Sequence, residues 1–200
     1  MKKQWSIILS VVLLISIACP VFAANGQSAD TTQGSDDFVT ASDYTEYLAK
    51  YAEASLASEE IQITATDFAG FEGTEPQKQQ DCLLIPDGST VSWKFQVEKA
   101  GLYQIAFCYA GAAGKGISIE RGIKINGKTP FSSAGNLEFG RTFQNKQDFH
   151  KTGEEYRPAQ VEVELFRECF LTGNGIESDI AYLFYFDNGI NELTLEYLSE

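Results

Sequence analysis

Positive charge is scarce in this chain. Its 200 residues include 15 lysines and arginines against 28 acidic residues, which gives a formal net charge of −13. A negative field of this strength repels phosphate backbones and anionic membrane surfaces. We therefore expect no nucleic-acid partner.

Familiar catalytic motifs are also missing from the sequence. His150 is the only histidine and lies in a polar stretch without an accompanying serine-nucleophile elbow, so nothing indicates a Ser-His-Asp triad. A Walker loop, a GxGxxG fingerprint, an HExxH motif and an EF-hand loop are all absent. A glycosidase needs only two facing carboxylates, but a small sandwich seldom forms a whole glycosidase cleft. We expect a non-catalytic protein and keep a hydrolase as a third hypothesis.

Cysteines are few, and none stands in a CxxC pair or beside a histidine. Beyond the amino-terminal segment only Cys82, Cys108 and Cys169 remain, so at most one disulfide bond is available. This pattern does not predict a structural zinc site or any other cofactor. We interpret the three as small hydrophobic residues of the interior.

The longest apolar run lies close to the amino terminus. Two lysines precede the run Ser6–Ala18, which is too short to span a membrane, and Val21-Phe22-Ala23 offers residues that a signal peptidase reads. This pattern predicts a signal peptide over residues 1–23, cleaved after Ala23, and a secreted or cell-surface protein. A lipid anchor at Cys19 is the alternative.

Residues 24–39 form a small, polar, acidic stretch that predicts a flexible leader. The folded domain is then expected over residues 40–200, beginning with an amphipathic helix at about 42–56. Tyrosines recur there at helical spacing after the start signal Ser42-Asp43. We expect this tyrosine stripe to dock the helix on a core.

From Glu60 onward apolar residues alternate with polar ones. The alternating runs are Ile61–Ala65, Val91–Val97, Tyr103–Tyr109, Ile117–Ile125, Val161–Leu165, Ile180–Phe186 and Leu193–Tyr197. Short strands with this period, separated by turn residues such as Asn126-Gly127, predict an all-β protein with an antiparallel β-sandwich. Trp93, in the middle of a strand, is expected in the core.

Three stretches carry a resemblance to a known family. VSWKFQVEKAGLYQIAFCYA (91–110) resembles the central hairpin of galactose-binding-like, carbohydrate-binding-module-like sandwiches. GKGISIERGIKINGKTPF (114–131), Arg157-Pro158 with Gln160, and NGINELTLEY (188–197) resemble the amino-terminal domain of large extracellular solute-binding proteins of ABC transporters from Gram-positive bacteria. The resemblance implies a jelly-roll sandwich that recognises an oligo- or polysaccharide. It also implies a missing carboxyl-terminal solute-binding domain and an ABC permease as partners.

The sequence departs from these relatives in two places. Many sugar-binding relatives hold a structural calcium ion on an Ile-Glu-Ala-Glu-type strand, whereas Ile63-Thr64-Ala65-Thr66-Asp67 stands here. Hydroxyls replace the carboxylates, which disfavours a calcium site in this chain. The relatives also continue beyond the position of Glu200 with a further strand. The resemblance therefore predicts a truncated domain with an unpaired sheet edge or a partly open core.

A sugar site needs an aromatic ring face beside polar groups, and in sandwiches the loops at one end supply them. The loops 110–121, 139–158 and 172–179 are the candidate surface. Their candidate ligand-binding residues are Tyr109, Glu120, Arg121, Arg141, Phe143, Asn145, His150 and Arg157.

Each candidate has a structural alternative. Tyr109 could end a core strand, and Phe143 could tuck the loop down. Arg141 and Arg157 could pin the loop to carboxylates, and Glu120 and Arg121, as strand neighbours, face opposite sides. If these alternatives hold, the chain is a structural or interaction sandwich that positions the solute-binding domain without a ligand of its own. An exposed apolar patch near the carboxyl terminus would then be expected.

Overall fold

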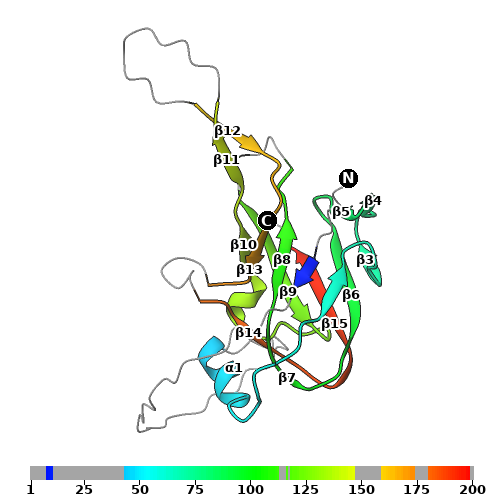
Figure 1. The fold of residues 1–200 in the computed structure, drawn as a ribbon, viewed down its shortest axis with the longest axis vertical. Helices are drawn as coiled ribbons and strands as arrows, with labels where there is room; N and C mark the ends of the chain where they lie inside the picture. Colours follow the sequence, from blue (N-terminus) through cyan, green and yellow to red (C-terminus); the bar gives the residue numbers. More distant parts are fainter. Residues whose placement is uncertain are drawn as a thin grey trace, which may run out of the picture.

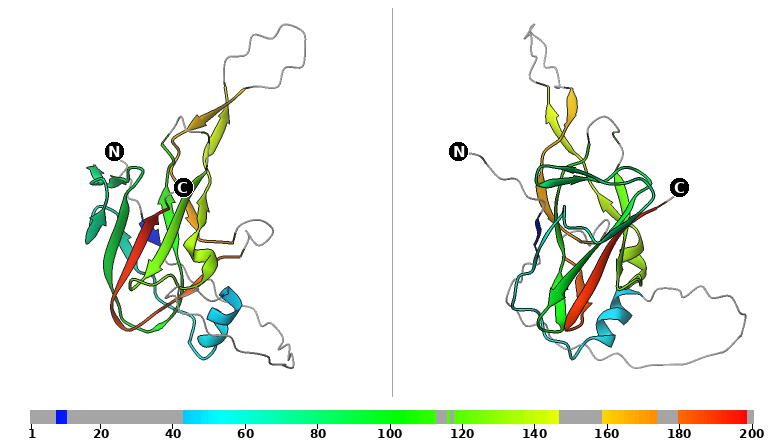
Figure 2. Two further views of the ribbon diagram at one scale, coloured as in Figure 1. Left: turned by 180° about the vertical axis from the view of Figure 1, so that it is seen from behind. Right: turned by 90° about the vertical axis from the view of Figure 1, so that its right-hand side faces the viewer.

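A computed structural model describes residues 8–10 (as backbone), 43–112, 116, 118–146, 159–173 and 180–198. It confirms the all-β sandwich: two sheet layers face each other, and one short helix lies at one end (Figures 1 and 2). Every ladder between its described strands is antiparallel.

The first layer is a five-stranded sheet in the order β10-β9-β15-β6-β3. Its strands are β3 (Gly70–Glu72), β6 (Thr90–Val97), β9 (Ile119–Ile125), β10 (Leu137–Phe139) and β15 (Gly189–Tyr197). The turn after β9 uses Asn126 and Gly127, both with positive φ, as the sequence predicts. The short 3₁₀ helix η1 (Ser132–Gly135) then leads into β10.

The second layer has the strand order β13-β8-β1-β2 and is extended by the pair β14-β7. Its strands are β1 (Ile8–Ser10), β2 (Gln62–Thr64), β7 (Gly101–Gln104), β8 (Ala106–Tyr109), β13 (Arg167–Phe170) and β14 (Leu183–Phe186). The run predicted at 103–109 therefore divides at Ile105, where the partner strand changes from β14 to β13.

Two small ribbons complete the sheets. The pair β4 (Gln77–Gln79) and β5 (Cys82–Leu84) lies beside β3 and β6, and the pair β11 (Thr142–Asn145) and β12 (Gln160–Val163) projects from the end opposite the helix (Figure 1). The predicted run Val161–Leu165 is only partly a strand, because β12 ends at Val163 and Leu165 is 47% exposed. The projecting ribbon has no second layer against it, so alternation there does not mark a buried face.

Apolar side chains from both layers meet in one core. Val91, Ile123 and Leu193 of the first layer and Phe184 of the second are fully buried. Trp93 is 5% exposed and donates its indole N–H to the carbonyl of Ala65 at 2.9 Å, which confirms its predicted place in the core. Cys82, Cys108 and Cys169 are only partly buried and form no disulfide bond with one another.

The helix α1 (Tyr44–Lys50) is shorter than predicted, because the chain continues from Tyr51 in turns. Its tyrosines dock on the sandwich as expected. The hydroxyls of Tyr44 and Tyr47 accept hydrogen bonds from the backbone N–H groups of Leu183 (2.9 Å) and Tyr185 (2.7 Å) in β14. The tyrosine stripe therefore attaches α1 to β14 by side-chain packing and by hydrogen bonds from backbone N–H groups.

Because of this docking, we expect the free energy of unfolding to change with pH in the alkaline range. Burial raises the pKa of Tyr47 to about 12, whereas a tyrosine in the unfolded chain ionises near pH 10. The unfolded state therefore releases a proton between about pH 10 and 12 that the folded state keeps, so the free energy of unfolding falls as pH rises through this window. Urea titrations at about pH 8 and 11 should show this loss and a smaller loss in Tyr47→Phe. An equal loss in both proteins would contradict the assignment.

The carboxyl-terminal strand differs from the expectation of an unpaired edge. β15 pairs with β6 from Gly189 to Leu195 and with β9 from Leu193 to Tyr197. It therefore lies inside its sheet with neighbours on both sides. The opening in this fold is found between the layers.

Candidate functional site

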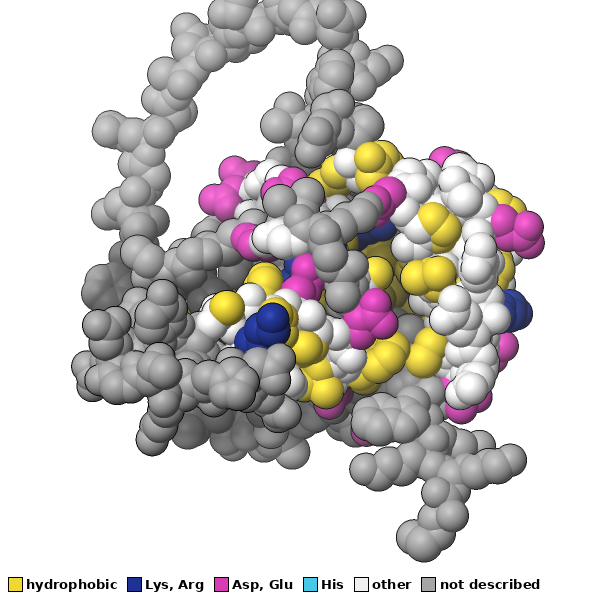
Figure 3. Space-filling view, turned by 90° about the horizontal axis from the view of Figure 1, so that it is seen from above, with side chains coloured by type: hydrophobic (Ala, Val, Ile, Leu, Met, Phe, Trp, Pro, Cys, Tyr) yellow, Lys and Arg dark blue, Asp and Glu magenta, His cyan; other side chains and the backbone are white. Residues whose placement is uncertain are grey.

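A cavity of about 830 Å³ lies between the two layers, near the base of the β11-β12 ribbon. The first layer contributes residues of β6, β9, β10 and β15, and the second contributes residues of β8, Ile63 of β2 and Ala65 just after β2. Residues of the segments 79–87, 110–112 and 164–166, together with Arg141, form the remaining walls. Seen from above, hydrophobic side chains surround a hollow with charged side chains at its rim (Figure 3).

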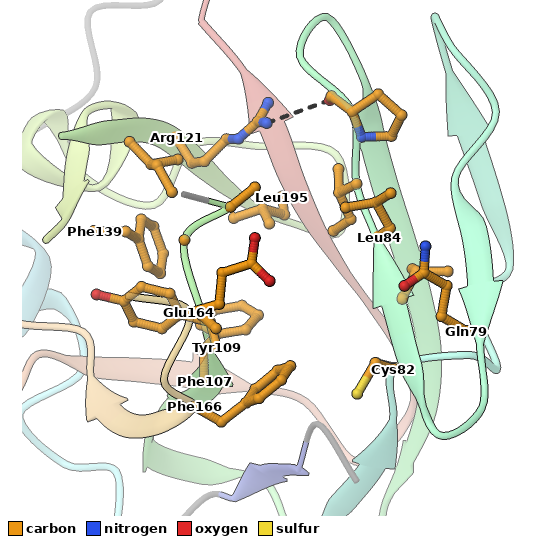
Figure 4. Close-up of a pocket in the computed structure, with 18 of the residues that line it drawn as sticks. Gln79, Cys82, Leu84, Phe107, Tyr109, Arg121, Phe139, Glu164, Phe166 and Leu195 are labelled. Carbon is orange, nitrogen blue, oxygen red and sulfur yellow. Dashed lines mark hydrogen bonds between the residues drawn. The ribbon is translucent and has the colours of Figure 1, made fainter. Parts of the chain in front are cut away.

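Aromatic side chains make up much of the wall. Phe139 packs edge-on against Phe107 and Tyr109, with ring centroids 5.8 and 5.2 Å apart. Phe166 faces the same space (Figure 4), and Trp93 also belongs to the lining. Rings held in this way present fixed apolar surfaces to a ligand in the cavity.

The Tyr109 hydroxyl is fixed by two hydrogen bonds. It donates to the carbonyl of Gly140 at 2.9 Å and accepts from Nη2 of Arg167 at 2.8 Å. Burial raises the pKa of Tyr109 above its ordinary value, so the hydroxyl stays protonated at neutral pH. Tyr109 ends a core strand, as its structural alternative proposed, and its ring also lines the cavity.

Arg121 is a buried cation in the cavity wall, with 5% of its surface exposed. Its guanidinium donates to the carbonyls of Ser89 (3.1 Å) and Pro86 (3.5 Å) and lies 5.3 Å from the centre of the Tyr197 ring. Burial lowers its pKa, but an arginine starts high enough to stay charged. Glu120 is exposed and faces away, paired across the ladder with Glu138, as expected for strand neighbours.

Arg141 forms a buried ion pair with Glu162. The two side chains are only 5% and 9% exposed, and Arg141 also donates to the carbonyl of Ala112. The pair joins the start of β11 to β12 and holds the segment after β8 against the ribbon. Arg141 thus pins the loop, as its structural alternative proposed, while its side chain lines the cavity.

Phe143 and Asn145 lie above this pair on one face of the ribbon. The register places Phe143 opposite Glu162 and Asn145 opposite Gln160, so these four positions share a face. Phe143 is 47% exposed, so it does not tuck the loop down. An exposed ring therefore stands beside amide and carboxylate groups at the cavity end of the molecule.

The predicted site is thus brought together in part. Tyr109, Arg121 and Arg141 line the cavity, Phe143 and Asn145 lie on the adjoining ribbon, and Glu120 lies elsewhere. His150 and Arg157 lie outside the described residues.

Glu164 and Phe166 were missed by the sequence reasoning. Figure 4 shows the Glu164 carboxylate in the space between Tyr109, Phe107 and Phe166 on one side and Leu84 on the other. Glu164 and Phe166 have the same parity as Glu162, whereas the apolar alternation of Val161 and Val163 would place Leu165 inward. The ladder with β11 ends at Val163, and the backbone N–H of Leu165 donates to the carbonyl of Val163 at 3.1 Å. The polar positions of this run face the cavity side, which the apolar pattern does not indicate.

Searches against protein-family models, curated proteins and solved structures give no match for this sequence. Among the residues described here, no three His, Cys, Asp or Glu side chains gather as a metal-ligand group. The same part of the chain contains no helix long and apolar enough to cross a membrane.

Proposed function

We propose that this chain is a non-catalytic, carbohydrate-recognising sandwich that is exported by its amino-terminal signal and belongs to a solute-binding protein of an ABC transporter. The observation that carries the recognition step is the cavity between the layers, where aromatic faces and fixed polar groups converge. A sugar ring needs both, because its C–H face packs on an aromatic ring while its hydroxyls exchange hydrogen bonds with polar side chains.

The size of the cavity suits a short oligosaccharide. Small-molecule sites in proteins occupy roughly 300–1,000 Å³, and this cavity of about 830 Å³ lies within that range. The ribbon face with Phe143 and Asn145 extends the contact surface beyond it. A chain of sugar units would rest partly in the cavity and partly on the ribbon.

The charges favour a neutral sugar. Arg141 is paired with Glu162, and the guanidinium of Arg121 is held by backbone carbonyls. Glu164 and Asp87 also line the cavity, within a chain of net charge −13. The net negative charge of the chain therefore disfavours an anionic sugar.

A glycan array followed by calorimetry tests this function. The full chain should bind at least one neutral oligosaccharide, and Phe166→Ala should weaken that binding at least about tenfold, the loss expected for one stacked ring (roughly 1.4 kcal/mol). Phe71→Ala is the matched control, because Phe71 is 43% exposed and outside the cavity lining. Silence across a broad panel of neutral glycans, or equal effects of the two variants, would refute the proposal.

A second candidate is a structural sandwich that positions the solute-binding domain and binds no sugar. Exposed apolar side chains on β15 favour it: Ile190 is 75% exposed and Tyr197 is 37% exposed. This candidate predicts a silent glycan panel and association through that strand.

A further inference from the structure

In the second layer, the segment 55–57 lies directly beside β7. Leu102 donates its N–H to the carbonyl of Ser55 at 3.0 Å, and Ala57 donates to the carbonyl of Leu102 at 2.9 Å. Ser55 approaches so closely that a Cβ atom added at Gly101 would lie 2.7 Å from its carbonyl oxygen. The segment 55–57 is therefore the direct, parallel neighbour of β7.

Beyond this contact the two segments move apart, and one further strand lies between them. β2 follows the segment 55–57 and β8 follows β7, but β2 and β8 are not paired with each other. β1 lies between them, antiparallel to both, with Leu9 opposite Ile63 of β2 and opposite Phe107 of β8. The layer thus contains a position one strand wide, bordered on both sides by strand backbone.

The occupant of this position belongs to the predicted signal peptide, and the inference rests on that part of the proposed function. Once residues 1–23 are removed, the edges of β2 and β8 that face β1 lose their partner. Unpaired strand edges of this kind readily accept another strand.

The vacated position also continues into the cavity. Ile63 and Phe107 border the cavity, and so do Ala65 and Tyr109, which lie two residues further along the same strands. Because side chains two apart share a face, an added strand would present its residue opposite Ile63 and Phe107 to the core. Its next alternate residue would lie beside the open cavity. β1, whose place the added strand would take, is the blue strand at the lower edge of Figure 4.

We infer that the exported protein binds a β-strand of a partner polypeptide in the groove between β2 and β8. The strand runs antiparallel to both and carries an apolar residue opposite Ile63 and Phe107, with a second apolar residue two positions away over the cavity. Its backbone groups complete the ladder, and its alternate side chains complete the core, which is the physics of strand addition. It is not acidic, because the chain carries a net charge of −13.

The chain's own amino-terminal segment serves as the probe. A sequence-specific protease site is inserted between residues 30 and 31 of the full chain, and the folded protein is cut without denaturant. Size-exclusion chromatography then measures how much of the amino-terminal fragment stays bound. A fluorescent peptide of residues 5–13, with two lysines added for solubility, is titrated into protein from which the fragment has been washed away.

We expect the cut fragment to stay bound to the folded protein, or the peptide to bind it saturably. In either format, Leu9→Asp should weaken the affinity at least tenfold. Leu13→Asp is the matched control, since it makes the same chemical change in the same apolar segment outside β1. Equal binding by the two variants would show non-specific adhesion and overturn the inference, as would absence of binding in both formats. No sugar enters this assay, so its failure is distinguishable from failure of the carbohydrate proposal.

Discussion

Truncation of Phe131 to alanine should lower the free energy of unfolding by about 3–5 kcal/mol, the usual cost of removing a fully buried aromatic ring. Phe131 is 0% exposed and packs against Tyr44 and Tyr47 of α1, with ring centroids 4.7 and 5.2 Å away. It also contacts Tyr182 and Phe184 at 4.9 and 5.5 Å. The ring joins the helix to β14, so its loss leaves a cavity that several aromatic residues border.

The matched control for this change is Phe143→Ala. Phe143 is the same residue type but is 47% exposed on the projecting ribbon, so its truncation should cost less than about 1 kcal/mol. Urea denaturation followed by circular dichroism measures both values. Similar losses in the two variants would contradict the packing described for α1 and Phe131.

Replacing Arg141 with methionine should destabilise the fold by about 3–5 kcal/mol, because it leaves the Glu162 carboxylate buried without its cation. Both side chains are nearly inaccessible, at 5% and 9% exposed. The double variant Arg141→Met/Glu162→Met should recover most of the loss, since it removes both charges and restores apolar contact.

The surface ion pair of Lys124 with Glu196 provides the comparison. Its side chains are 33% and 31% exposed, so Lys124→Met should change stability by about 0–1 kcal/mol. Denaturant titrations at low and high salt measure the free energy of unfolding of the unmodified protein, the two single variants and the double variant. A double variant that is no more stable than Arg141→Met would show that the arginine acts through packing alone.

The strands were predictable because their alternation coincides with burial. In β6, Val91, Trp93 and Val97 face inward, and in β15 Leu193 and Leu195 do the same. Two apposed layers bury one face of each strand, so period two in the sequence translates directly into a sandwich. The tyrosines of α1 were predictable for the same reason, through helical spacing.

The candidate site was predictable only in part. Tyr109 lies at the end of an alternating run, so its position at the edge of the core could be predicted from the sequence. Glu164 and Phe166 lie on the side of their run opposite to the apolar residues Val161 and Leu165, which are exposed, so the apolar pattern pointed to the wrong face. The residues 79–87 on the opposite wall show no pattern that links them to Tyr109. Distances between such segments depend on packing between layers, and local periodicity carries no information about it.

The sequence by itself determined the fold class, the inward faces of most strands, the docking of α1 through its tyrosines and the net negative charge. Each of these depends on residues a few positions apart along the chain, where backbone geometry fixes which side chains share a face. Tertiary structure alone decided the cavity between the layers, the buried Arg141–Glu162 pair and the strand-wide position between β2 and β8. Those features depend on which distant strands become neighbours, and that choice is made by the free energy of packing the whole core.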